Sequence, residues 1–297
     1  MFDAKELRGV MTAIATPMNK DGSVDFGALD DFVESQIEGG VDGLVPCGTT
    51  GESATMSADE RAQVITAVVK KAADRVVVVA GAGSNNTADA IEHQKRAKDT
   101  GAKLSLVVTP FYNKPTPEGL YRHYSALLEA VDLPIVLYNV PGRTGCDMKP
   151  DTVGRLAKLD GIVAVKEATG DLDRVAGIRN LTEGENFAVL SGDDVTTCPF
   201  VLLGGDGVIS VTSNVAPKEM ARMVHAALDG KVAEAREVHN SLRDLFAALF
   251  FESNPIPVKA ALAMQNKMQE AYRLPLCEMS KNPRDALAAV LKAGGWI

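Results

Sequence analysis

The sequence is short of the residues that several classes of protein require. Its four cysteines lie far apart and form no Cys-X-X-Cys pair. Thiols this sparse favour a reducing compartment over a disulfide framework or a structural zinc site. The formal net charge of -8 at pH 7 leaves no basic patch for phosphates, so we expect no nucleic-acid partner.

Long apolar runs are also missing. None approaches the roughly 18 residues of a membrane span, so we expect no membrane partner. The first residues, MFDAKELRGV, carry charge and lack the apolar core of a signal peptide. The composition, 46% hydrophobic and 24% charged, is that of a globular enzyme. Together these features predict a soluble, cytoplasmic protein.

Motifs for metals and nucleotides are absent as well. The four histidines all fall in stretches with a helical pattern, and none shows HxH or HExxH spacing. A metal-dependent barrel hydrolase or a zinc aldolase would therefore lack its ligands, and we expect no metal site. The sequence also contains no GxxxxGK[ST] loop and no GxSxG elbow.

Short, β-rich apolar runs alternate with longer amphipathic stretches along most of the chain. Several runs are continuously apolar, which is typical of parallel strands buried on both faces. Helix signals lie between them, such as the capping box formed by Ser57 and Glu60 and a first-turn proline at Pro150. The runs predict eight strands, at Val10–Thr16, Gly43–Cys47, Val76–Gly81, Leu104–Thr109, Ile135–Asn139, Ile162–Lys166, Phe187–Ser191 and Gly207–Val211.

This alternation permits a closed barrel or an open, doubly wound sheet. An open sheet of the dinucleotide-binding kind carries a glycine-rich loop after its first strand, but here that strand runs into Ala15-Thr16-Pro17. We therefore predict an α/β fold, a single (β/α)8 TIM barrel in residues 1–225. The pattern becomes purely helical from about Ala216, and we assign residues 226–297 to a C-terminal helical extension packed on the barrel.

Barrel enzymes place their catalytic groups at the carboxyl ends of the strands, and Lys166 closes the sixth run. The apolar run before Lys166 would hold the stem of its side chain inside the barrel, where little water reaches the amine. Loss of hydration favours the neutral, nucleophilic form of an amine. Taken alone, Lys166 can equally be a lysine that pairs with Glu167 or that points outward at the rim.

Two other strand ends carry three further candidates, each with an ordinary structural alternative. Tyr138 can relay protons beside Lys166, or it can be a core tyrosine. The loop Gly48–Gly51 offers hydroxyl and N–H groups to a small carboxylate, or it simply caps the next helix. Arg143 can bind a second carboxylate bidentately, or it can form a surface salt bridge.

Three motifs in this sequence are more specific than the single residues: Gly48-Thr49-Thr50-Gly51-Glu52, Tyr138-Asn139-Val140-Pro141-Gly142-Arg143-Thr144 and Val165-Lys166-Glu167-Ala168-Thr169-Gly170-Asp171. From about Gly9 to the C-terminus the chain resembles the pyruvate-dependent class I aldolase superfamily, and within it the dihydrodipicolinate synthases. The doubled threonine and the Gly-Arg-Thr triplet are typical of the synthases. N-acetylneuraminate lyases and keto-deoxy-sugar aldolases usually differ at one or both.

The resemblance implies that Lys166 forms an imine with pyruvate and that the enamine attacks L-aspartate 4-semialdehyde, a step of lysine and diaminopimelate synthesis. Thr49 and Thr50 would bind the carboxylate of pyruvate. Arg143 would hold the carboxylate of the semialdehyde, and the backbone of Ile209 would line the site. The resemblance implies neither a metal nor an organic cofactor.

It also implies a proton relay made by Tyr138, Thr50 and Tyr112, in which Tyr112 reaches in from a neighbouring subunit. The usual assembly in this family is a homotetramer built from tight dimers. A relay residue donated between subunits would make a dimer the smallest active unit.

Regulated members of the family bind lysine at the dimer interface. Where some lysine-sensitive relatives have two histidines, this chain has Ala58 and Arg61, and an arginine would disfavour the ammonium group of the ligand. A tyrosine is replaced by Phe111 and a glutamate by Asp89. We therefore expect weak or absent inhibition by lysine. The positions that match the effector site are Ser53, Ala54, Ala58, Arg61, Asn85, Asp89 and Phe111.

Three rival functions remain open on the sequence. The first keeps the imine chemistry but takes a sugar-derived aldehyde as the acceptor. The second is a catalytically silent barrel that binds a keto acid, although binding alone would not call for both an amine and a relay. The third is metal-dependent hydrolysis, which predicts loss of activity with chelators.

Overall fold

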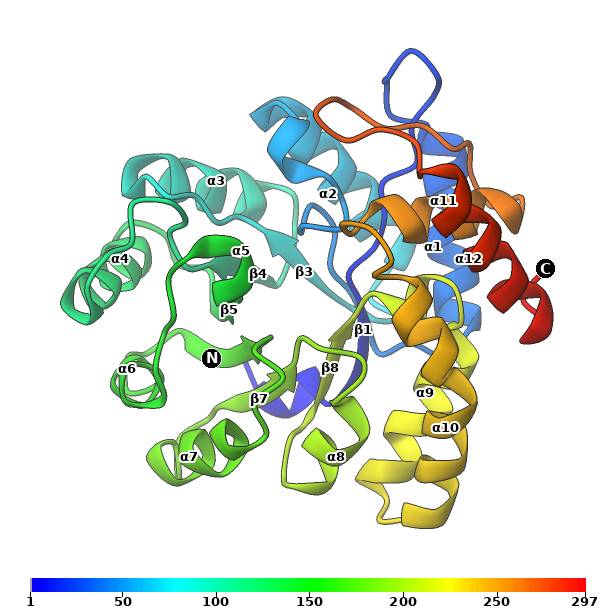
Figure 1. The fold of residues 1–297 in the computed structure, drawn as a ribbon. Helices are drawn as coiled ribbons and strands as arrows, with labels where there is room; N and C mark the ends of the chain where they lie inside the picture. Colours follow the sequence, from blue (N-terminus) through cyan, green and yellow to red (C-terminus); the bar gives the residue numbers. More distant parts are fainter. Residues whose placement is uncertain (1) are drawn as a thin grey trace.

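The protein is a closed barrel of eight parallel strands, seen in a computed structural model that describes residues 2–297 (Figure 1). Strand order follows chain order, and β1 closes the barrel by pairing with β8. The predicted TIM barrel is therefore confirmed, and the open sheet is excluded. The strands are β1 (Gly9–Thr12), β2 (Gly43–Leu44), β3 (Val77–Gly81), β4 (Leu104–Val108), β5 (Ile135–Asn139), β6 (Ile162–Glu167), β7 (Ala188–Ser191) and β8 (Gly207–Ser210).

Helices alternate with these strands and surround them (Figure 1). The capping box at Ser57 and Glu60 is present, and Pro150 begins a helix, as predicted. None of the helices described between residues 2 and 297 combines the length and apolarity of a membrane span. The α-helices are α1 (Phe26–Glu38), α2 (Ala58–Ala72), α3 (Thr87–Asp99), α4 (Pro117–Ala130), α5 (Pro141–Thr144), α6 (Pro150–Leu156), α7 (Asp173–Leu181), α8 (Thr197–Leu202), α9 (Pro217–Leu228), α10 (Val232–Ala248), α11 (Ile256–Met264) and α12 (Lys281–Ala293). The short 3-10 helices are η1 (Ala4–Leu7), η2 (Ser53–Thr55) and η3 (Thr212–Asn214).

Two strands end several residues earlier than predicted, while β3, β4, β7 and β8 are each one residue shorter than predicted. β1 ends at Thr12 instead of Thr16, and β2 ends at Leu44 instead of Cys47. Single backbone bonds continue past both ends, since Ile14 donates to Val45 at 3.2 Å. Beyond them Pro46 has no N–H to donate, and Cys47 turns the chain at a φ of 56°. The residues between the observed and the predicted strand ends stay buried, so the apolar pattern continues beyond the regular strand.

Side chains fill the inside of the barrel beneath its carboxyl end. One buried cluster joins residues of the strands, including Met11, Val79 and Leu190, with Leu7 of η1. Leu7 is fully buried, so η1 packs on the interior from the amino end of the strands. A barrel packed in this way is closed as a pore, and the carboxyl ends of its strands are left to form a site.

The C-terminal helices α10 to α12 lie on one flank of the barrel, beside α1 and α9 (Figure 1). Leu242 and Phe246 of α10 belong to the same buried cluster as Leu29 of α1, so extension and barrel share a core. The predicted boundary between residues 225 and 226 falls inside α9. The chain leaves α10 at Ala248, and the Pro255-Ile256-Pro257 segment then begins α11.

His123 on α4 makes the stability of this fold depend on acid. It is 5% exposed, its Nδ1 lies 2.9 Å from Thr87 Oγ1, and burial lowers its pKa to about 4. The histidine pKa in the unfolded chain is near 6.5, so between pH 6.5 and pH 4 the unfolded chain binds a proton at this histidine and the folded chain does not. The stability that the neutral, buried His123 contributes is complete above pH 6.5 and is lost as pH falls toward 4. Each pKa unit corresponds to about 1.4 kcal/mol, so we expect a loss of about 3 kcal/mol across that range.

A His123→Gln variant tests this expectation, because glutamine does not titrate. Its free energy of unfolding in urea should fall less steeply between pH 6.5 and pH 4 than that of the parent. His225 supplies a control of opposite sign, since its hydrogen bond to Asp42 raises its pKa and adds stability at low pH. The stability that His225 adds is complete below its unfolded pKa near 6.5 and is lost as pH rises through its raised folded pKa, so His225→Gln should alter the pH dependence above pH 6.5 and leave the slope between pH 6.5 and pH 4 close to that of the parent. Equal slopes for His123→Gln and the parent would contradict the prediction.

Candidate active site

Lys166 and Tyr138 meet at the carboxyl ends of neighbouring strands. In the parallel pairing of β5 with β6, Tyr138 is the direct partner of Lys166. The Lys166 Nζ lies 4.4 Å from the centre of the Tyr138 ring, and the two residues are 5% and 7% exposed. Sequence reasoning placed both at adjacent strand ends, and the structure brings the amine and the phenol ring into contact.

Lys166 is not paired with its neighbour Glu167. The Glu167 carboxylate accepts hydrogen bonds from Asn139 Nδ2 at 3.0 Å and from the Thr169 N–H at 2.8 Å. Its ion pair is with Arg174, at 3.5 Å. Within residues 2–297 no carboxylate lies within ion-pair distance of Lys166, so the alternative of a Lys166–Glu167 pair is wrong.

Gly192, after β7, gives Lys166 its space. A Cβ built on Gly192 would lie 2.9 Å from Lys166 Cε and 2.6 Å from Ala168 Cβ, which is closer than carbon atoms approach. Any side chain at this position would therefore push the lysine out of its place. Glycine at this position allows the backbone of residue 192 to approach the Lys166 side chain closely.

The loop after β2 is held in an unusual backbone conformation. Cys47 and Glu52, on either side of the loop, both have a φ of 56°. Such values are uncommon for residues with a side chain. Between them, Thr49 and Thr50 reach the cavity that also contains Lys166 and Tyr138. The position suits the predicted task of binding a small carboxylate.

We call this space the central cavity and define it by Lys166, Tyr138, Thr49, Thr50, Arg143 and Asn254, which line it. Arg143 lies on α5, immediately after β5, and its Nη2 donates to the backbone oxygen of Asn254 at 3.3 Å. The structure therefore brings a buried amine, a phenol, two hydroxyls and a guanidinium to one small space. No group of three His, Cys, Asp or Glu side chains placed to hold a metal occurs among the described residues 2–297.

The side chains of two predicted residues lie outside the central cavity. The side chain of Ile209 on β8 packs in the barrel interior, whereas Val211, two residues on, lines the central cavity. A part for the Ile209 backbone in the site stays a prediction. Tyr112 does not line the cavity of its own chain; it is 86% exposed and has a φ of 74°. Its donation from a neighbouring subunit stays a prediction.

Asn254 and Phe250 line the central cavity and were missed by sequence reasoning. Both belong to the segment between α10 and α11, which had been assigned only to packing. The sequence signal that could have pointed to Asn254 was the Asn-Pro-Ile-Pro run. A polar residue directly before a proline, in an otherwise apolar segment, suggests that its side chain makes a specific contact.

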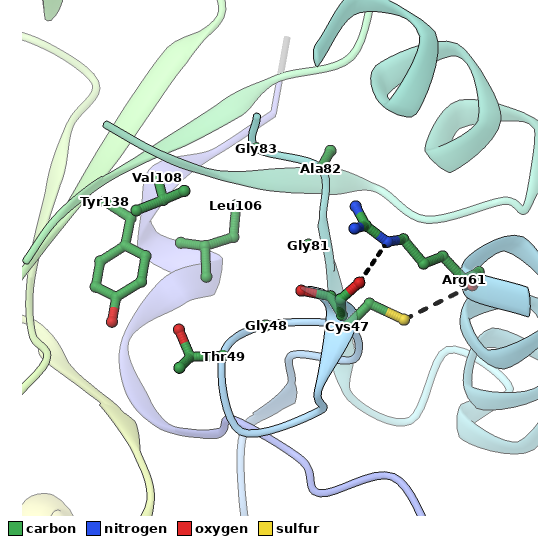
Figure 2. Close-up of a pocket in the computed structure, with 11 residues that line it drawn as sticks. Cys47, Gly48, Thr49, Arg61, Gly81, Ala82, Gly83, Leu106, Val108 and Tyr138 are labelled. Carbon is green, nitrogen blue, oxygen red and sulfur yellow. Dashed lines mark hydrogen bonds between the residues drawn. The ribbon is translucent and has the colours of Figure 1, made fainter. Parts of the chain in front are cut away.

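A second space shares Thr49 and Tyr138 with the central cavity and is also lined by Arg61 and Gly81 (Figure 2). Figure 2 shows the hydroxyl groups of Thr49 and Tyr138 turned toward each other at its edge. Arg61 Nε donates to the backbone oxygen of Ser53 at 3.0 Å, and burial lowers the pKa of Arg61.

The expected effector residues are only partly gathered there. Ser53, Ala54, Arg61 and Phe111 line one adjoining cavity, which Asn85 and Asp89 do not line. Asn85 instead donates from Nδ2 to the backbone oxygen of Phe111 at 3.1 Å. Weak or absent inhibition by lysine stays a prediction.

Comparison with known proteins agrees with this geometry over nearly the whole chain. Residues 6–294 match the sequence model of the Dihydrodipicolinate synthetase family. The chain belongs to this family. A 4-hydroxy-tetrahydrodipicolinate synthase from Methylococcus capsulatus is 53% identical over 291 residues, covering 98% of this chain and 100% of that protein. One from an Anaeromyxobacter species is 54% identical over 275 residues, 93% of each chain.

A solved relative has the same fold. The crystal structure of the chloride-inhibited dihydrodipicolinate synthase from Acinetobacter baumannii, complexed with pyruvate, superposes with a TM-score of 0.96 at 47% identity. It covers 98% of this chain and 99% of that chain. Family membership makes this protein a Schiff-base enzyme of the class I aldolase type, as predicted. The alternatives of a silent barrel and of a metal-dependent hydrolase are therefore wrong.

Proposed function

We propose that this protein condenses pyruvate with L-aspartate 4-semialdehyde to 4-hydroxy-tetrahydrodipicolinate, a step of lysine and diaminopimelate synthesis, through an imine on Lys166. The observation that carries the proposal is the contact between the buried Lys166 amine and Tyr138, in a chain of this family. An amine without a carboxylate partner is available as a nucleophile once it has lost its proton.

The chemistry follows from the groups around the central cavity. The Lys166 amine attacks C2 of pyruvate, and water leaves the carbinolamine to give the imine. Loss of a proton from C3 gives the enamine, whose C3 forms a bond to the aldehyde carbon. The aldehyde oxygen takes up a proton. The amino group of the former semialdehyde then attacks C2, closes the ring and displaces the Lys166 amine.

The protons in these steps need carriers that reach the reacting atoms. We assign the relay to Tyr138, Thr50 and Tyr112, and the binding of the pyruvate carboxylate to Thr49 and Thr50. We also propose that Tyr112 comes from the partner in a tight dimer, two of which form a homotetramer. Its 86% exposure and its place outside the cavity of its own chain support that role.

Trapping of the imine tests the proposal directly. The protein is incubated with pyruvate and borohydride, and its intact mass is measured. One reduced pyruvate adduct per chain is expected, and turnover should follow when L-aspartate 4-semialdehyde is supplied without borohydride. A folded protein that forms no adduct would remove the proposal.

Arg143 decides which acceptor aldehyde is used. Arg143→Ala is expected to lower kcat/KM for the semialdehyde by about 100-fold or more, since a charge-assisted hydrogen bond to the substrate carboxylate is lost. The rate of imine trapping with pyruvate should stay near that of the parent. Steady-state kinetics with varied semialdehyde measure the effect.

The matched control is Arg122→Ala on α4, an exposed arginine paired with Glu118, which should leave the kinetics unchanged. If Arg143→Ala has no more effect than this control, the acceptor is not recognised through Arg143. A sugar-derived aldehyde would then become the better candidate.

A further inference from the structure

Asn254 is one of two residues of the C-terminal extension that line the central cavity, and the other is Phe250. Its side chain is buried, with 5% of the residue exposed, and its Nδ2 donates to Thr50 Oγ1 at 3.0 Å. Its backbone oxygen accepts from Arg143 Nη2 at 3.3 Å. One residue of the extension therefore contacts both a relay hydroxyl and the proposed acceptor-binding arginine.

The segments that carry Thr50 and Asn254 are fastened to each other behind the cavity. Glu52, two residues after Thr50, forms a fully buried ion pair with Lys259 of α11. The Glu52 carboxylate also accepts from the backbone N–H of Arg273 at 3.3 Å. This anchoring holds Asn254 at a set distance from the Thr49-Thr50 loop, independently of any substrate.

The direction of the Asn254–Thr50 hydrogen bond has a chemical consequence. A threonine hydroxyl has one hydrogen to donate. Because Asn254 occupies an acceptor site of Thr50 Oγ1, that hydrogen points away from Asn254. No protein atom within residues 2–297 accepts it, so it is available to the central cavity.

We propose that Asn254 is a positioning residue, which orients the Thr50 hydroxyl so that its hydrogen faces the proton relay and the bound substrate. This inference rests on the proposed function, because it assigns Asn254 a part in the same reaction. Asn254 acts through Thr50 by its side chain, and it supports Arg143 only by its backbone.

Two substitutions separate orientation from simple structural support. In Asn254→Ala the hydroxyl rotates freely, and we expect kcat and the rate of borohydride trapping to fall about 10-fold, the effect of one lost hydrogen bond. The KM for the semialdehyde should stay within about twofold, since the backbone oxygen still accepts from Arg143.

Asn254→Asp has almost the same shape as the parent but reverses the hydrogen bond. The carboxylate would accept the hydrogen of Thr50 and draw it out of the cavity. We expect this variant to lose more kcat than Asn254→Ala, about 100-fold relative to the parent. Because it is close to isosteric, it tests the inference even if the alanine variant fails to fold.

The control is Asn240→Ala, the same change at a position of α10 away from the central cavity, which should keep parental kinetics and parental trapping. Parental kcat in Asn254→Ala or in Asn254→Asp would overturn the inference. So would a rise in KM for the semialdehyde in step with the loss of kcat in Asn254→Ala, which indicates a displaced loop. If the parent itself forms no pyruvate adduct, it is the proposed function that fails.

Discussion

Lys166→Ala is expected to form no borohydride-stable adduct with pyruvate and to lose about 10^4-fold or more in turnover. The Lys166 amine is the proposed nucleophile, and without it C2 of pyruvate would not become an imine that can accept electrons from C3. Tyr138, Thr50 and Arg143 would still bind and orient the substrates, but they would have no covalent intermediate to act on. Intact mass after trapping and a steady-state assay with both substrates measure the two effects.

A matched control separates this loss from a general effect of removing lysines. Lys158 is exposed, so Lys158→Ala should form the adduct and turn over as the parent does. A second buried lysine near the site, Lys259, is paired with Glu52, which keeps its amine from attacking a substrate. An adduct that persists in Lys166→Ala would show that the nucleophile is another amine.

Lys259→Met should lower the free energy of unfolding by about 3–5 kcal/mol, because it leaves Glu52 as a buried charge without its partner. Lys259 and Glu52 both have fully buried side chains. Burial lowers the pKa of Lys259, which marks the cost of keeping its charge away from water. Methionine fills nearly the same volume, so lost packing contributes little. Urea unfolding at neutral pH measures the change.

The double variant Glu52→Gln/Lys259→Met tests the reason for that loss. With both charges gone, most of the stability is expected to return, since no unpaired charge stays buried and the glutamine oxygen can still accept from the backbone N–H of Arg273. Lys281→Met on α12 removes one partner of an exposed pair with Asp285 and should change stability very little. If the double variant is no more stable than Lys259→Met, lost packing and not the unpaired charge explains the effect.

Much of the barrel could be predicted because its signals are local. The apolar runs placed all eight strands, and strand order followed chain order. Consecutive parallel strands lie side by side, so residues at the ends of the fifth and sixth runs had to be neighbours. The meeting of Tyr138 and Lys166 was therefore contained in the sequence. The motifs around these two residues are specific enough to indicate the family by themselves.

The tertiary structure alone decided which distant residues complete the site. Asn254 and Thr50 are 204 positions apart, and Lys259 and Glu52 are 207 apart. No periodicity connects such positions, because their contacts exist only once the barrel has closed and the extension has docked against it. The same packing placed Ile209 in the interior and Val211 in the cavity. The sequence by itself determined the barrel and pointed to the proposed nucleophile, whereas the shape and the polar anchoring of the site depend on contacts between segments that only folding brings together.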